Sequence, residues 1–251
     1  MSKISVTTIA GLTSGGDANK VKIESGDTLQ VESNATVGGT LGVTGAATLS
    51  GNATIGTNSG DTRFSLNSAN QYTMVFKNAG NIAGQIGGAS SDELRFSNAA
   101  GATTMQINAG HITKPMQPAF SARADITNIP LTTQTTLLLS AERFDVGSNL
   151  SSNTFTAPIT GKYLFTYMLY FTQVDADHTT LDVHIKTSNK QYQQTFSPDH
   201  FFNSDSNFSI SGSVIADMDI NDTCFFTVYV AGGSAQTDVH TDSQVSGCLL
   251  L

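Results

Sequence analysis

The middle of the C-terminal half reads F-T-A-P-I-T-G-K-Y-L-F from Phe155 to Phe165. The segment from Gly161 to Phe171 is rich in aromatic and apolar strand formers, which indicates a β-strand. Side chains alternate between the two faces of a strand, so Tyr163 and Phe165 share one face. We expect that face to lie in the core of this part of the chain or at a subunit interface.

Further strand-forming segments flank this one at a spacing typical of a β-sandwich or jelly roll. They are Thr136–Leu139, Thr180–Lys186, Phe208–Ala216, Cys224–Val230 and Gln244–Leu251. No segment with a helical period competes with them. Two prolines within T-K-P-M-Q-P, residues 113–118, end the preceding segment. We therefore place one domain at residues 115–251, a normal size for a single domain.

These residues resemble the complement C1q-like domain. The run from Phe155 to Phe165 is similar to the most characteristic motif of that family. P-A-F-S-A-R at 118–123 resembles its opening strand, S-G-S-V-I at 211–215 a late strand, and V-S-G-C-L-L at 245–250 the closing strand. Three positions depart from the family pattern: Ser152-Asn153, Asn221-Asp222 and Cys248.

The resemblance implies a ten-stranded jelly roll that assembles as a trimer through apolar and aromatic faces near its axis. The aromatic residues expected in the core or at the trimer contact are Phe120, Phe155, Tyr163 and Phe165.

Residues 61–114 contain shorter strand candidates separated by Gly, Asn and Ser clusters, as expected for antiparallel hairpins. They are Arg63–Leu66, Tyr72–Phe76, Ile82–Ile86, Glu93–Phe96 and Thr103–Ile107. Arg95 alternates with Leu94 and Phe96, which indicates a half-buried strand. We interpret 61–114 as a small β module or a second shaft section.

A six-residue period covers residues 29–60. Its first position holds aliphatic residues and its fifth mostly small ones, with Gly, Ser, Thr and Asn between them. The aliphatic residues are Val31, Val37, Val43, Leu49 and Ile55. The pattern resembles the hexapeptide rule of left-handed β-helices, in which a large side chain fills the interior. A disordered linker is the alternative, since such composition often lacks a core.

Five hexads make fewer than two coils of such a helix, and stacked repeats generally need at least about three units. Three identical chains around one axis would solve this by pooling their aliphatic residues. The sequence thus predicts an all-β homotrimer with a β-helical or hairpin shaft followed by a C1q-like jelly-roll knob.

The N-terminal part resembles the glycine-rich shafts of bacteriophage tail fibres, on the passage T-V-G-G-T-L-G-V-T-G at residues 36–45. Residues 1–28 precede the period, and we interpret them as an attachment segment that contacts other virion structural proteins. The resemblance implies a virion protein, in the tail or another surface appendage, that is assembled in the host cytoplasm.

Composition restricts the classes of function. The chain has 251 residues, a formal net charge of −8 and only 13% charged residues. Binding of nucleic acid requires clustered Lys and Arg, which are missing here. No stretch approaches the about 18 apolar residues of a membrane span, and the N-terminus lacks the apolar core of a signal peptide. Cys224 and Cys248 allow a disulfide, but free thiols fit intracellular assembly better.

Three acidic and histidine-containing loops are candidate receptor-binding sites, because binding residues concentrate on loops held by rigid scaffolds. Their residues are Asp175, Asp177 and His178, then Asp199 and His200, then Asp238 and His240. The alternating Asp175 and Asp177 suggest either a solvated turn or a calcium site, since calcium takes about six to eight oxygen ligands. Phe201-Phe202 could be an exposed contact or part of a trimer interface.

No catalytic residues or other cofactors are expected, since no nucleophile-elbow motif occurs. We predict a structural virion fibre whose trimeric knob binds a host-surface glycan or protein, without membrane insertion. A purely structural appendage, a capsid decoration or a trimerising adaptor is the alternative, and a glycan-degrading tailspike enzyme comes third.

Overall fold

The computed structural model describes residues 31, 37, 41–44, 72–88 and 93–250, and the chain divides into two units, 1–64 and 65–251. In the first unit, Val31, Val37 and Val43 are exposed in the single chain. Leu49, Ile55 and the attachment segment at 1–28 lie outside the described residues. The trimeric shaft therefore stays a prediction.

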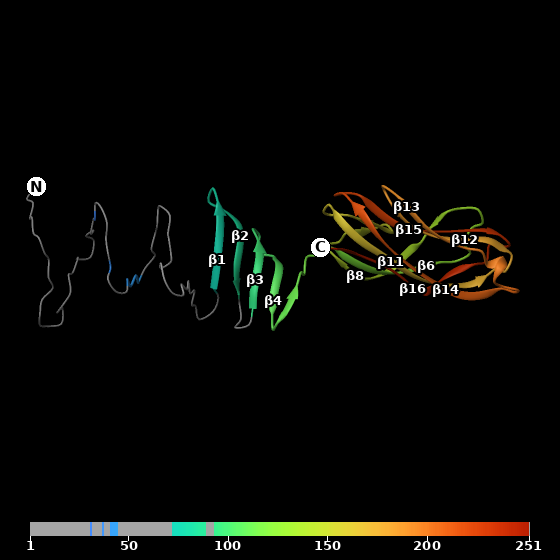
Figure 1. Cartoon of the computed structure of the whole chain (residues 1–251), viewed down its shortest axis with the longest axis horizontal. Helices are drawn as coiled ribbons and strands as arrows, with labels where there is room; N and C mark the ends of the chain where they lie inside the picture. The colour runs from blue at the N-terminus through green and yellow to red at the C-terminus, as the bar shows by residue number, and fades with distance from the viewer. Residues whose placement is uncertain (1–30, 32–36, 38–40, 45–71, 89–92, 251) are drawn as a thin grey trace, which may run out of the picture. The chain divides into compact units, whose positions relative to one another are not determined.

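The first five strands of the second unit form one antiparallel sheet in chain order (Figure 1). They are β1 (Tyr72–Asn78), β2 (Asn81–Gly88), β3 (Glu93–Asn98), β4 (Thr103–Asn108) and β5 (His111–Thr113). The predicted run of hairpins is confirmed for β1 to β4, whereas the three-residue β5 was not predicted. The candidate strand Arg63–Leu66 lies outside the described residues.

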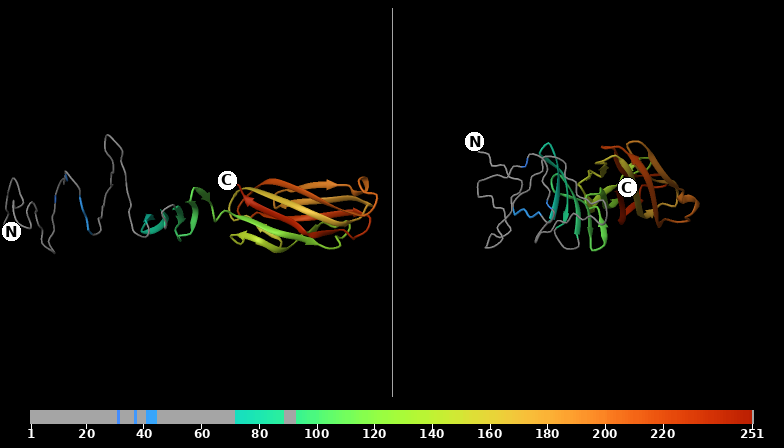
Figure 2. Two further views of the ribbon diagram at one scale, coloured as in Figure 1. Left: turned by 90° about the horizontal axis from the view of Figure 1, so that it is seen from below. Right: turned by 60° about the vertical axis from the view of Figure 1, so that its left-hand side comes forward.

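The following residues form a sandwich of two sheets (Figure 2). A five-stranded sheet has the order β14-β11-β16-β6-β8. Its strands are β6 (Ala119–Ile126), β8 (Leu138–Val146), β11 (Gly161–Val174), β14 (Ser206–Met218) and β16 (Asp238–Leu249). All of their pairings are antiparallel.

A six-stranded sheet with the order β13-β12-β15-β10-β9, and with β7 paired to β15, forms the other layer. Its strands are β7 (Thr135–Thr136), β9 (Leu150–Ser151), β10 (Thr154–Thr156), β12 (His178–Thr187), β13 (Gln191–Phe196) and β15 (Thr223–Gly232). A short 3-10 helix, η1 (Pro198–His200), follows β13. This part of the chain thus contains the strands β6 to β16 and not the ten strands expected, since β7 and β9 are separate two-residue strands.

The core lies between the two sheets and is aromatic at one end. Phe120, Phe155, Tyr163 and Phe165 are all buried there. Phe155 contacts the other three rings at centroid distances of 5.1 to 5.8 Å. Gly247 makes room for them, since a Cβ atom at this position would lie 2.6 Å from both Phe120 and Phe165. These four side chains therefore hold the sheets together within one chain.

Both cysteines are free thiols, and Cys224 is buried whereas Cys248 is partly exposed. Burial raises the pKa of the Cys224 thiol. Across the described ranges, no helix has the length and apolarity that crossing a membrane requires.

Candidate binding site at the apex of the sandwich

The three loops that carry the candidate binding residues all lie at one end of the sandwich, which we call the apex. There β11 ends beside the start of β14, and β12 starts beside the end of β15. The opposite end, the base, holds Pro118 and Leu249, whose backbones are joined by a hydrogen bond of 2.9 Å. The long strands run between the two ends (Figure 2). The topology thus gathers residues that are up to 65 positions apart, from Asp175 to His240.

Asp175 holds two apical loops together from the inside. Its Oδ1 accepts a hydrogen bond of 2.8 Å from the backbone N–H of Asp177, and its Oδ2 accepts one of 2.6 Å from that of Ser234. These donors keep the pKa of Asp175 below its usual range, the Asp177 N–H contributing most. Gly233 has a φ of +61° and packs so closely that a Cβ there would lie 2.7 Å from the carboxyl carbon.

His178, the first residue of β12, is fully buried. Its Nδ1 lies 2.7 Å from the carbonyl oxygen of Gly232, and its Nε2 lies 2.8 Å from the hydroxyl of Thr237. A carbonyl oxygen can only accept, so Nδ1 carries a proton and donates it to this bond. In the neutral ring, Nε2 then accepts from the Thr237 hydroxyl. His178 therefore joins the β12 start to the loop between β15 and β16.

Asp205 joins the third loop to the other two. Its Oδ1 accepts from the backbone N–H of Ala176 at 3.2 Å, and its Oδ2 accepts from Nε2 of Gln236 at 2.7 Å. No sequence motif marks this residue, because its partners are set by the topology. With Asp175 and His178 it makes the apex a cross-linked frame.

The side chains exposed on this frame include those of Asp177, Asp199, His200 and Phe201. Nε2 of His200 lies 3.9 Å from the carboxylate of Asp199, which is close enough for a weak ion pair when the histidine is protonated. Phe201 exposes 68% of its surface. Exposed aromatic rings of this kind are common anchors in binding interfaces.

Phe201 is held in place by a stack of aromatic rings that begins in the core. Its ring lies 4.9 Å from Phe196, which lies 4.7 Å from Phe208. Phe208 in turn stacks at 5.5 Å on Phe171, which is fully buried. The exposed ring therefore has a fixed position and loses little conformational freedom when a partner covers it.

Asp238 and His240 line a separate pocket of about 350 Å³ beside the apex. Its walls come from β6, β8, β11 and β16, with Ile126 and Leu138 as apolar members. Asp238 accepts hydrogen bonds from the backbone N–H of Asn128 at 2.7 Å and from Gln173 at 3.0 Å. His240 packs edge-on against Tyr170 at a centroid distance of 5.3 Å.

A family model described as the C1q domain matches residues 119–250, more than half of the sequence. The chain belongs to the C1q domain family. This membership is consistent with a protein that is not an enzyme.

Several solved structures are similar to the C1q domain of this chain. The globular domain of zebrafish complement 1qA protein is 16% identical, with a TM-score of 0.41, covering 54% of this chain and 98% of that one. Murine APRIL is 10% identical, with a TM-score of 0.38 and coverages of 53% and 99%. PRD1 vertex protein P5 is 13% identical, with a TM-score of 0.37 and coverages of 54% and 99%. No curated protein matches the sequence.

Two of the residues expected as receptor contacts lie inside the C1q domain. Asp175 and His178 were expected as receptor contacts, but both are buried and their polar atoms are engaged inside the frame. The calcium hypothesis at Asp175 and Asp177 gains no support, since both oxygens of Asp175 already accept backbone hydrogen bonds. In the described part of the chain, no group of three or more His, Cys, Asp and Glu side chains is arranged to hold a metal ion.

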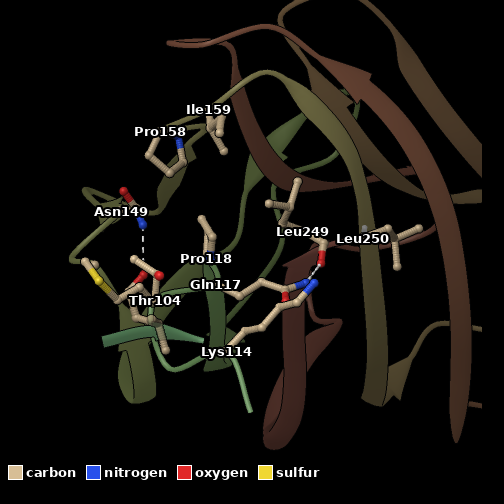
Figure 3. A pocket seen from close by; sticks show the side chains of 12 residues that line it. Thr104, Lys114, Gln117, Pro118, Asn149, Pro158, Ile159, Leu249 and Leu250 are labelled. Atoms are coloured by element: carbon tan, nitrogen blue, oxygen red, sulfur yellow. Dashed lines mark hydrogen bonds between the residues drawn. The ribbon is translucent and has the colours of Figure 1, made fainter. Parts of the chain in front are cut away.

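A larger pocket of about 630 Å³ lies at the base of the C1q domain (Figure 3). Its apolar lining includes Pro118, Ile159, Leu249 and Leu250, and the side-chain amide of Gln117 donates to the carbonyl of Leu249. None of the candidate binding residues lines it. The exposed binding candidates lie at the apex and in its side pocket, away from this cavity.

Proposed function

We propose that the chain is a homotrimeric virion fibre whose C-terminal C1q domain binds a host-surface molecule with its apex. The observation that carries this proposal is the apical frame. Buried Asp175 and His178, together with the exposed Asp205, cross-link three loops, and the frame presents Asp177, His200 and Phe201 to solvent. A rigid frame with exposed polar and aromatic side chains suits adhesion.

A fibre of a bacteriophage tail or another virion appendage is supported by the order of the sequence. The hexad period at 29–60 precedes the C1q domain, and residues 1–28 precede the period. Under this proposal the N-terminal segment attaches to other virion proteins, the period forms a shaft, and the C1q domain is the distal knob.

Self-association is supported by the outer face of the five-stranded sheet. Met168 and Ile215 expose 54% and 59% of their surface on this face. Between them runs a row of small hydroxyl residues, Ser213, Thr166, Ser246 and Ser121, which are paired across neighbouring strands. The middle of this face, between the Lys162–Asp217 ion pair and Arg123, carries apolar and small uncharged side chains that can pack closely against another copy.

Three copies would also strengthen weak binding. Tethering three sites raises the effective concentration of the second and third, and avidity can exceed single-site affinity by about 10²–10⁴. The loops at 127–134, 175–178, 197–205 and 232–242 contain no Lys or Arg. Their aspartates disfavour an anionic partner, so a neutral glycan or a protein surface with few acidic groups fits best.

The experiment has two parts. Light scattering of the full chain should give three times 26.4 kDa, and a monodisperse monomer would contradict the fibre. The affinity for host cells should then fall at least about tenfold in Phe201→Ala. Aromatic side chains that become buried in an interface typically contribute about 2 kcal/mol or more to the binding free energy. Lys190→Ala, in the turn between β12 and β13, is the matched control and should bind normally.

Glycan arrays with the same proteins identify the chemical class of the receptor. A trimer that binds neither cells nor glycans would leave a purely structural appendage as the function. Release of reducing sugars from a host polysaccharide would instead point to a tailspike enzyme.

A further inference from the structure

The sheet formed by β1 to β5 has one face that is predominantly apolar. Met74, Ile86, Phe96 and Met105 are paired across β1, β2, β3 and β4, which places them in one row. Leu94, Ile107 and Ile112 form a second row across β3, β4 and β5. We call the following eight residues the apolar face: Met74, Phe76, Ile86, Leu94, Phe96, Met105, Ile107 and Ile112.

The opposite face is mostly polar. Its central row consists of Thr73, Gly87, Arg95, Gln106 and Thr113, again paired strand by strand. Arg95 on this face forms an ion pair of 2.6 Å with Glu93. Because neighbouring side chains alternate, the charges of β3 lie on the face opposite to its apolar residues. The apolar face therefore includes no ionisable side chain.

No layer of the described chain covers the apolar face. None of its eight residues is buried, and Phe76 and Ile112 expose 46% and 67% of their surface. All strand pairings of β1 to β5 are within their own sheet. A sheet with one apolar face is stable only when that face packs against another layer. The missing layer must come from outside these strands.

We propose that the apolar face packs against the same face of two further copies of the chain, so that three sheets enclose a common core. This inference rests on the proposed trimer, because the hexad period on one side and the C1q domain on the other would hold three copies of the sheet together. At such high local concentration, copies of the sheet meet each other before any other partner.

The chemistry of the face fits this occupant. Identical faces without charges match one another, and burying them leaves no ion without a partner. The net charge of −8 would oppose association of copies through charged surfaces. In this module, however, the charged side chains of β3 point away from the contact. Association through the apolar face thus avoids the repulsion.

The chain contains no tryptophan, so one introduced indole reports its own surroundings. Phe96→Trp places the probe in the centre of the apolar face. Val75→Trp is the matched control, since Val75 lies on the opposite face of the same sheet, in register with Gln85. Each full-length protein is measured for emission wavelength, for quenching by acrylamide, and for mass by light scattering.

The expected result is a trimer in which the Phe96→Trp indole emits at shorter wavelength and is quenched several-fold less than the Val75→Trp indole. A trimer in which both indoles are quenched equally would overturn the sheet contact and leave the proposed fibre standing. A monomer, whatever its quenching, would overturn the fibre and this contact together. A dimer with a protected indole would overturn the three-fold arrangement.

A second pair of variants covers the case in which tryptophan disturbs packing. Phe96→Lys should cause loss of protease resistance within residues 72–113, because it places a charge in the shared core. Val75→Lys should leave that resistance unchanged. If Phe96→Lys is as resistant as the unmodified chain, the apolar face is not covered and the inference is wrong.

Discussion

At the scale of single residues, the apex depends on contacts that only particular side chains can make. Gly232 has a φ of +79°, and a Cβ there would lie 2.7 Å from the carbonyl oxygen of Asp177. Gly233 leaves space for the carboxylate of Asp175 in the same way. These glycines allow the loop between β15 and β16 to approach the loop between β11 and β12. Exposed residues at the apex can then vary without changing the frame.

Asp175→Asn should make the stability of the chain less sensitive to acid. The folded pKa of Asp175 is below the ordinary value of about 3.9. The contribution of Asp175 to the free energy of unfolding is therefore complete above the ordinary pKa. It is lost as the pH falls through the folded pKa. Urea unfolding from pH 7 to about pH 3 measures this, and Asp177→Asn is the exposed control. Asp222 also has a lowered pKa, through N–H donation from Asp219 first, so part of the acid sensitivity should remain.

An equal acid response in Asp175→Asn and the unmodified chain would contradict the buried role of this carboxylate.

Phe165→Ala should lower the free energy of unfolding by about 3–5 kcal/mol, the usual cost of removing a buried aromatic ring. Phe165 is fully buried, with Phe155 at a centroid distance of 5.8 Å. Asp177→Ala should leave stability nearly unchanged, since its side chain is exposed. Chemical denaturation of both variants gives the ranking, and the reverse order would contradict the packing of β11.

At the scale of elements, strands with a regular apolar pattern could be predicted from sequence, the edge strand β14 among them, whereas the mostly exposed edge strands β8 and β13 could not. β11 and β12 have buried side chains that form clear apolar patterns. β8 and β13 lie at the edges of their sheets and are mostly exposed. In β8, Glu142 and Arg143 interrupt any apolar pattern, so only its first residues were predicted. Edge strands form through pairing with a neighbour, and a local sequence pattern does not record that pairing.

The candidate site, too, could be predicted only in part from the sequence. The sequence showed which loops are rich in Asp and His, and the topology brought those loops together at the apex. Burial could not be predicted, because Asp175 and His178 look like solvated loop residues until their partners at 232–237 are known. Asp205 was missed for the same reason.

The hexad period makes a prediction about deletions. Deleting Val43–Thr48 removes one whole hexad and keeps the later aliphatic residues in phase, whereas deleting only Val43–Gly45 shifts them by half a period. Apolar side chains worth about 1.5–3 kcal/mol each when buried would then face solvent. Limited proteolysis should find the six-residue deletion tolerated and the three-residue deletion cleaved within residues 29–60. Equal resistance of both deletants would mean that the period is a linker.

At the scale of the whole molecule, the family match begins at residue 119, close to the proline-marked boundary placed at 115. A buried cluster connects residues from Phe120 to Val245 within this part. Such a part carries its own core and should not need the preceding residues to fold.

Residues 115–251 expressed alone should therefore fold, melt cooperatively and form trimers. Differential scanning calorimetry and light scattering of the fragment test these points. A folded fragment that is monomeric would mean that trimer contacts lie in residues 1–114. An insoluble fragment would show that the boundary at 115 is wrong.

The backbone hydrogen bond between Pro118 and Leu249 has a mechanical consequence under the proposed adhesive function. The chain enters the C1q domain at its base along β6, which lies between β16 and β8. Tension between a bound apex and the base pulls β6 along its own axis. All ladder hydrogen bonds on both sides of the strand then resist in shear, instead of opening one after another. This topology suits an anchor that must bear load.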